Sequence, residues 1–221
     1  MIIGVFDTGK GGEIVAKRLR EFFPEHEFLV INDCEHLPYG SKTPNEITQL
    51  TDAAIQPLIK QGIKIIIIAC NTATAVAIAY LRAKYPDRNF IGFEPAVKPA
   101  AKGVKVKKII VLATPVTLRS AKYLALKKRF ASDVEVIEPD CSTWASKIEN
   151  NEFETTDLAP IIEIAQRENV DKIVLGCTHY LAIEDDLRAI LPSKIVVVEP
   201  IAAIARRLDS IIHSLQSEHV C

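Results

Sequence analysis

The segment Lys64–Ala69, with four consecutive isoleucines, constrains the fold of this 221-residue chain more than any other feature. A short run that is apolar on both sides of the backbone suits a central strand of a parallel sheet, because helices cover both faces of such a sheet. Strand and helix patterns also alternate along the whole chain. This alternation implies an α/β fold with parallel sheets and right-handed crossovers.

The order of the predicted elements shows where the pattern restarts. Strands are expected at residues 2–6, 27–31, 64–69, 89–93, 108–113, 134–137, 171–176 and 194–198. Helices are expected at residues 13–23, 44–60, 72–84, 115–130, 142–150, 157–169, 183–191 and 200–215. The stretch 94–103 contains two prolines and separates the two series, so it is the best candidate for a domain boundary.

The two halves of the chain share one local pattern. Lys64–Ala77 reads KIIIIACNTATAVA and Lys172–Leu181 reads KIVLGCTHYL. Each is a buried strand that ends in a cysteine and leads through a threonine into a helix. Because active sites of parallel sheets lie at the carboxyl ends of strands, Cys70 and Cys177 fit one cysteine per domain facing a shared cleft. A lone cysteine at a strand end is usually a core residue, so both a functional and a structural interpretation stay open here.

Composition and charge exclude several classes of function. The formal net charge of -1 offers no electrostatic case for binding nucleic acid or an anionic membrane. No secretory signal is visible, and the longest apolar run is too short to span a bilayer. The five cysteines are an odd number without CxxC pairs, which argues against a disulfide framework and for a reducing cytoplasm. Cys34, Cys141 and Cys221 have no local context that suggests chemistry.

Three short motifs near the ends of predicted strands resemble known functional motifs but lack residues that those motifs require. Gly4–Lys10 nearly matches a P-loop, but Gly11 stands where the motif needs Ser or Thr. Asp7–Gly9 occurs once, whereas aspartic proteases need two such copies on an all-β frame. His179 is close to Cys177 in sequence, but a zinc site would need further ligands nearby, so no metal is expected.

The glycine-rich turn Thr8–Gly12 follows the first strand. Its glycines leave backbone N–H groups free at the start of a helix, where they could hold a carboxylate. A plain strand-to-helix turn is the better interpretation of this segment alone.

Five motifs, in this order, resemble those of the glutamate racemases: DTGKGG at 7–12, PYG at 38–40, ACNTA at 69–73, ATPVT at 113–117 and LGCTHY at 175–180. The resemblance extends from Ile3 to about Leu208. The wider aspartate/glutamate racemase superfamily shares the paired cysteines, and the first two motifs point to the glutamate branch.

The resemblance implies two pseudo-symmetric α/β domains with the active site in the cleft between them. They would comprise residues 1–94 plus 199–221 and residues 95–198. Neither pyridoxal phosphate nor a metal is implied, the partner is a small amino acid, and a homodimer is possible. Cys70 and Cys177 would be the acid/base residues, with Asp7 near Cys70 and His179 near Cys177. The substrate site would be lined by Thr8, Pro38, Tyr39, Gly40, Asn71, Thr72, Thr114, Thr117 and Thr178, and Glu149 falls where the family carries a glutamate near the pocket.

Two thiols suit the racemisation that the resemblance implies. A proton leaves one face of Cα and another arrives at the opposite face, so two opposed groups are simpler than one. The pKa of a free thiol is about 8.5, so modest local help would give a thiolate near neutral pH. We therefore expect interconversion of L- and D-glutamate, supplying D-glutamate for peptidoglycan. A racemase for aspartate or other amino acids, or a non-catalytic binding relative, stays open as an alternative.

Departures from the family pattern concern the surroundings of the thiols. Thr8 stands in place of the usual Ser, Leu181 in place of a proline, and Glu199 in place of an aspartate. The segment Cys141–Trp144 replaces a more apolar one that contains proline. These changes affect expectations for substrate range and oligomer geometry, and none removes a catalytic group.

Overall fold

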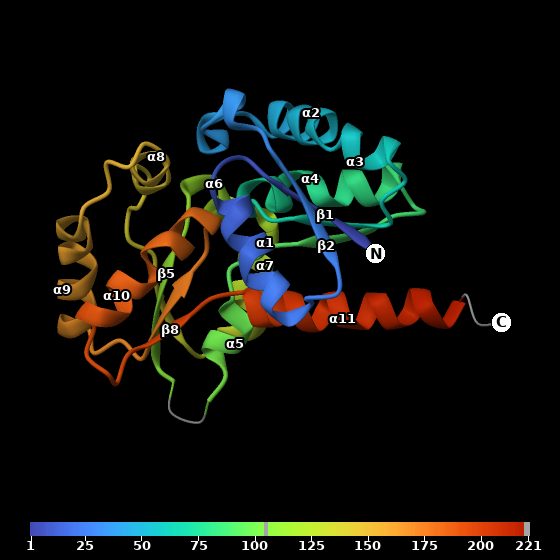
Figure 1. Ribbon diagram of the computed structural model, residues 1–221. Helices are drawn as coiled ribbons and strands as arrows, with labels where there is room; N and C mark the ends of the chain where they lie inside the picture. The colour runs from blue at the N-terminus through green and yellow to red at the C-terminus, as the bar shows by residue number, and fades with distance from the viewer. Residues whose placement is uncertain (104–105, 219–221) are drawn as a thin grey trace.

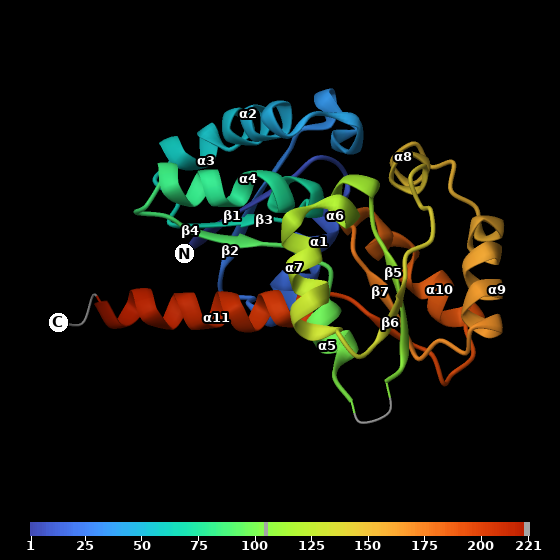
Figure 2. The same cartoon turned by 180° about the vertical axis from the view of Figure 1, so that it is seen from behind.

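The computed structural model describes residues 1–103 and 106–218, and Cys221 lies outside this part of the chain. Two four-stranded sheets follow each other along the chain (Figures 1 and 2). The first has the order β2-β1-β3-β4 and the second β6-β5-β7-β8, and every neighbouring pair is parallel. The strands are β1 (Ile2–Asp7), β2 (Glu27–Asn32), β3 (Ile65–Ile68), β4 (Asn89–Gly92), β5 (Lys108–Leu112), β6 (Glu135–Ile137), β7 (Lys172–Leu175) and β8 (Val196–Val198). The predicted α/β fold with two parallel sheets is confirmed.

Helices connect the strands and cover the sheets. In the first half they are α1 (Gly11–Phe22), α2 (Pro44–Ala54), α3 (Gln56–Lys60), α4 (Asn71–Lys84) and α5 (Val97–Ala101). In the second half they are α6 (Pro115–Arg119), α7 (Ala121–Phe130), α8 (Trp144–Glu149), α9 (Ala159–Arg167), α10 (Glu184–Ile190) and α11 (Ile201–Glu218). Short 3-10 turns are η1 (Cys34–His36), η2 (Tyr39–Ser41), η3 (Thr155–Leu158) and η4 (Thr178–Ile183).

Two predicted helices are each divided in two. The expected helix 44–60 breaks at Ile55, because Pro57 lacks the N–H that a continuous helix would need. The expected helix 115–130 breaks at Ser120, whose backbone is extended and whose hydroxyl accepts a hydrogen bond from the Tyr123 N–H at 3.1 Å. In addition, the proline-containing boundary 94–103 holds the short helix α5, which the pattern did not predict.

The isoleucine run forms the centre of the first sheet. All four isoleucines of β3 are fully buried, and Ile67 lies between Val5 of β1 and Ile91 of β4. Ile65 and Ile67 pack into a core that includes residues of α1 and α11, while Ile66 and Ile68 pack on the opposite face against α2, α3 and α4. The core under α1 continues into the second sheet, so the two sheets share one apolar interior. No helix in the described part of the chain is both long enough and apolar enough to cross a membrane.

Candidate functional site

A cavity of about 240 Å³ lies where the central strands of both sheets end. Thr8 follows β1, Cys70 follows β3, Thr114 follows β5 and Cys177 follows β7, and all four residues line this cavity. Of the other predicted site residues, Pro38, Tyr39, Gly40, Thr72 and His179 line it as well. Topology explains this convergence, since parallel strands place their carboxyl ends at one edge of each sheet.

The Cys70 thiol is buried and accepts two hydrogen bonds from its own half of the chain. The Thr8 hydroxyl donates to Sγ at 3.6 Å, and the Ala73 backbone N–H donates at 3.5 Å. The pKa of Cys70 is raised to about 12, because burial and the nearby Asp7 charge raise it more than the hydrogen bonds to its sulfur lower it. Cys70 is therefore a neutral thiol at neutral pH.

Cys177 heads a series of three side chains. Its Sγ lies 3.7 Å from His179 Nδ1, and His179 Nε2 lies 2.8 Å from Glu149 Oε2. Because an ionised carboxylate can only accept, the neutral imidazole carries its proton on Nε2 and turns the Nδ1 lone pair toward the thiol. Burial raises the pKa of Cys177 well above its ordinary value, and Cys70 and Asp7 raise it further when they are ionised. His179 is thus the basic group next to this thiol.

Asp7 lies at the end of β1, and its carboxylate is held by backbone groups. Oδ2 accepts hydrogen bonds from the Gly9 N–H at 3.2 Å and the Gly12 N–H at 3.1 Å, and Oδ1 accepts one from the Thr178 hydroxyl at 3.0 Å. The glycine-rich turn therefore does hold a carboxylate, which is that of the chain itself. Burial raises the pKa of Asp7, while His179 and these hydrogen bonds lower it. Among the described residues, Asp7 forms a hydrogen bond to neither thiol.

Gly9 leaves the space in which the histidine and the glutamate meet. A Cβ at this position would lie 2.5 Å from Glu149 Oε2 and 2.8 Å from His179 Nε2. The Lys10 backbone N–H also donates to Glu149 Oε2 at 3.0 Å, and Lys10 Nζ donates to the Glu149 carbonyl oxygen at 2.6 Å. The turn between β1 and α1 therefore fixes Glu149, which comes from α8 in the other half of the chain.

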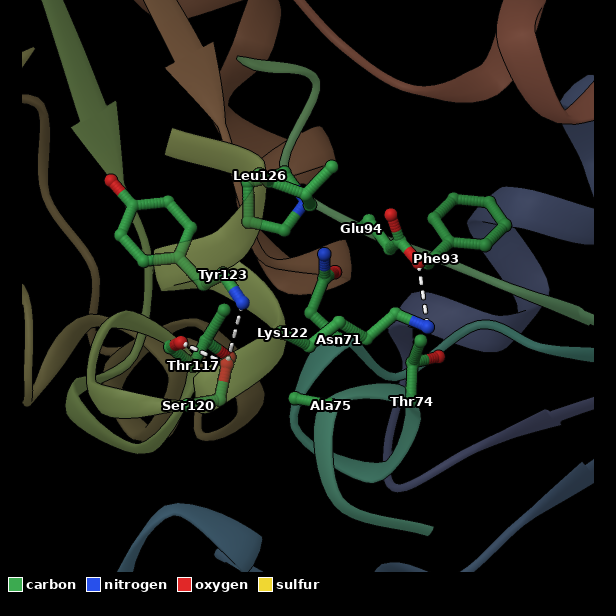
Figure 3. Close-up of a pocket in the computed structure, with 11 residues that line it drawn as sticks. Asn71, Thr74, Ala75, Phe93, Glu94, Thr117, Ser120, Lys122, Tyr123 and Leu126 are labelled. Atoms are coloured by element: carbon green, nitrogen blue, oxygen red, sulfur yellow. Dashed lines mark hydrogen bonds and ion pairs between the residues drawn. The ribbon is translucent and has the colours of Figure 1, made fainter. Parts of the chain in front are cut away.

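Three predicted substrate residues do not line the cavity. Asn71 and Thr117 line a smaller neighbouring cavity together with the Glu94–Lys122 ion pair (Figure 3). The Asn71 amide is buried there without a hydrogen-bond partner in the described residues. Thr117 Oγ1 lies 3.0 Å from Thr114 Oγ1, so it supports a hydroxyl that does line the cavity. Thr178 instead donates to Asp7, as described above.

Several lining residues were not predicted: Leu37, Ser41, Pro115, Ser142, Ala145 and Ser146. Leu37 and Ser41 flank the PYG motif, and Pro115 follows Thr114. Ser142, Ala145 and Ser146 have the i, i+3, i+4 spacing of one helical face, which was the available signal. Among the described residues that line the cavity there is no Lys or Arg. The described residues also contain no group of three or more His, Cys, Asp or Glu placed to hold a metal ion.

Comparison with known proteins gives consistent results. The family model described as Asp/Glu/Hydantoin racemase matches residues 13–208. The chain is 39% identical over 214 residues to a glutamate racemase of Pseudomonas syringae, covering 95% of this chain and 78% of that protein. It is 38% identical over 218 residues to one of Pseudomonas aeruginosa, covering 95% of this chain and 81% of that protein.

Solved structures give the same picture. The crystal structure of Escherichia coli glutamate racemase, in complex with L-glutamate and the activator UDP-MurNAc-Ala, has a TM-score of 0.87 at 28% identity. This match covers 96% of our chain and 82% of that one. Glutamate racemase from Francisella tularensis, in complex with D-glutamate, has a TM-score of 0.80 at 27% identity. Here 97% of our chain and 81% of that one are covered.

Proposed function

The chain belongs to the Asp/Glu/hydantoin racemase family, and on this basis we propose that it interconverts L- and D-glutamate with Cys70 and Cys177 as opposed acid/base groups. One observation carries the proposal: both thiols line a single cavity, and each comes from the end of a central strand in a different sheet. The glutamate racemases similar to this chain, among them structures with L-glutamate and D-glutamate, support glutamate as the substrate.

The reaction needs one thiolate and one thiol. The thiolate removes the α-proton from one face of the amino acid, and the opposite thiol delivers its proton to the other face. The electron pair released at Cα is held meanwhile on the α-carboxylate, so aligned neutral donors around that group stabilise the intermediate. Hydroxyls of Thr72 and Thr114 line the cavity and can supply such donors. The product has the opposite configuration, and the two cysteines have exchanged their protonation states.

Ionising a buried thiol requires a nearby cation. Since no Lys or Arg of the described residues lines the cavity, the α-ammonium group of the amino acid is the available positive charge. On the Cys177 side, His179 can accept the thiol proton at Nδ1, and the Glu149 carboxylate stabilises the imidazolium that results. On the Cys70 side, the Thr8 hydroxyl and the Ala73 N–H stabilise a thiolate by donating to its sulfur.

We propose residues 1–94 with 199–221 and residues 95–198 as the two domains that each carry one thiol. D-glutamate made by this enzyme would serve peptidoglycan synthesis. The cysteines in the described part of the chain are unpaired, which favours a reducing cytoplasm as the location of the enzyme, and a homodimer is proposed from the family resemblance.

Incubation with L-glutamate in D2O tests the function directly. We expect deuterium at Cα together with loss of optical rotation, and we expect Cys70→Ser and Cys177→Ser each to reduce racemisation sharply. Absence of exchange in a folded, reduced sample would refute the enzyme, and full activity of either variant would refute the two-base assignment. A parallel assay with aspartate tests the substrate, because a clear preference for aspartate would overturn glutamate.

A further inference from the structure

Helix α1 of the first half packs along η4 of the second half (Figure 1). The η4 turn directly follows Cys177 and contains Thr178 and His179. Its start is tied to the first half by the bond from the Thr178 hydroxyl to Asp7 Oδ1. The position of η4 against α1 therefore affects where Cys177 and His179 lie relative to Cys70.

Arg18 of α1 ties the other end of η4. Its Nη1 donates to Glu184 Oε2 at 2.5 Å, and its Nη2 donates to the Leu181 carbonyl oxygen at 3.2 Å. Glu184 begins α10 directly after η4 and is only 5% exposed. A buried carboxylate of this kind keeps its partners, because losing them would leave a charge without solvation.

Glu184 has a second arginine partner that stays within the same half of the chain. Arg188 donates to Glu184 Oε1 from Nε at 2.9 Å and from Nη2 at 2.6 Å, and it also donates to the Val197 carbonyl oxygen at 2.9 Å. One carboxylate thus binds two arginines, and of these two Arg18 is the one that links the half that carries Cys70 to the half that carries Cys177.

We propose that Arg18 is a positioning residue that sets the spacing between Cys70 and Cys177 by clamping η4 to α1. The inference rests on the proposed two-thiol racemisation. Proton transfer is steep in distance, and a misplacement of about 1 Å in a reacting group can cost about 100-fold in rate. Hydrogen bonds to the substrate tolerate shifts of a few tenths of an ångström. Loss of the Arg18 bonds to η4 and Glu184 should therefore lower kcat more than it raises KM.

The test compares Arg18→Ala with Arg188→Ala. Each variant removes one arginine from the same carboxylate and leaves the other, so the Glu184 charge keeps a partner in both. We expect Arg18→Ala to lower kcat by about 10- to 100-fold with KM changed by less than about threefold. Arg188→Ala should keep kcat within about twofold of wild type while lowering the melting temperature to a comparable extent. Arg18→Lys, which keeps the charge but cannot make both bonds, should lie between wild type and Arg18→Ala.

A second readout does not depend on activity. A bifunctional alkylating reagent is applied, and mass spectrometry gives the ratio of Cys70–Cys177 crosslinks to protein alkylated at only one of these two cysteines. This ratio should fall in Arg18→Ala and stay at the wild-type value in Arg188→Ala. Equal kcat losses in the two variants, or an unchanged crosslinking ratio in Arg18→Ala, would overturn the clamp. If Arg18→Ala does not fold, Arg18→Lys provides the same comparison.

Failure of the proposed function is distinguishable from failure of the clamp. A wild-type protein that does not racemise glutamate refutes the function, and the crosslinking ratio still decides whether Arg18 sets the spacing of the thiols.

Discussion

Replacing Glu149 with Gln removes one negative charge from the Cys177–His179–Glu149 series while keeping the shape of the side chain. In the wild type, one oxygen, Oε2, accepts both the bond with His179 Nε2 at 2.8 Å and the bond from the Lys10 N–H at 3.0 Å. The Gln amide oxygen can take the same two bonds, and its NH2 group then occupies the position of Oε1. The substitution therefore tests the charge of Glu149 separately from its geometry.

The size of the effect follows from the bond that loses its charge. A hydrogen bond to a charged group contributes about 1.5–3 kcal/mol, against about 0.5–1.5 kcal/mol for a neutral one. The difference of about 1.4 kcal/mol acts on the imidazolium form of His179, which forms when Nδ1 takes the Cys177 proton. Since about 1.4 kcal/mol is tenfold in rate, we expect Glu149→Gln to lower kcat/KM about tenfold. The rise of kcat/KM with pH should also move to higher pH, because the Cys177 proton becomes harder to remove.

Circular dichroism of glutamate measures initial rates in both directions across a pH series. Because the two enantiomers have equal free energy, kcat/KM must fall equally for L- and D-glutamate, which provides an internal check. Glu152→Gln is the matched control, since Glu152 is exposed, lies three positions further on, and forms no ion pair among the described residues. Wild-type kcat/KM with an unshifted pH profile in Glu149→Gln would refute the assigned role of the carboxylate.

Gly9→Ala puts a methyl group 2.5 Å from Glu149 Oε2, so the contact between Glu149 and His179 must shift. We expect kcat/KM to fall at least about tenfold while the far-UV circular dichroism spectrum stays unchanged. Wild-type kinetics in this variant would contradict the prediction. Burial raises the pKa of Asp7 in the folded protein above its value in the unfolded chain. Protonated Asp7 therefore contributes fully to stability below the unfolded-state pKa, and this contribution is lost as pH rises through the folded-state pKa. Asp7→Asn should therefore melt no lower than wild type at about pH 8, and a lower melting temperature would contradict this prediction. When the protein is treated with iodoacetamide, mass spectrometry should show that exposed Cys34 is alkylated before Cys70. The alkylation rate of Cys70 should still rise about tenfold per pH unit near pH 10, because its pKa is raised. A plateau of this rate below pH 10 would contradict the raised pKa.

The sheets were predictable because their strands are short apolar runs with sharp ends. The buried run of β3 and its counterpart β7 need no tertiary information to be recognised as strands covered on both faces. The helix breaks at Ile55 and Ser120 were missed because the apolar spacing continues across them. At such points a local detail decides, either a proline without an N–H or a serine hydroxyl that starts a new helix.

The side-chain partners within the site were harder to predict than its residues. Strand ends point to Cys70 and Cys177, and the family resemblance adds Asp7, but which groups they bind depends on how two separate sheets face each other. The bond between Thr178 and Asp7 and the contact between Glu149 and the Gly9 turn both join distant parts of the chain. Asn71 was predicted to line the substrate site but does not, because its place beside Cys70 in sequence does not determine on which side of α4 its amide lies.

Ionisation of the thiols is where the structure changes the chemistry expected from sequence. A free thiol needs little help to ionise near neutral pH, but the pKa of Cys70 is raised to about 12 by burial, even though two hydrogen bonds to its sulfur lower it. Ionisation near neutral pH therefore needs a further stabilising charge, and the cation that arrives with the amino acid can supply it. Cys70 therefore stays protonated until a substrate with a free α-ammonium group enters, whereas Cys177 has His179 beside it as a proton acceptor. An N-acylated glutamate, which keeps both carboxylates but lacks this charge, should therefore undergo Cα exchange in D2O far more slowly than glutamate even where it binds, and exchange at a rate comparable to that of glutamate would refute this account.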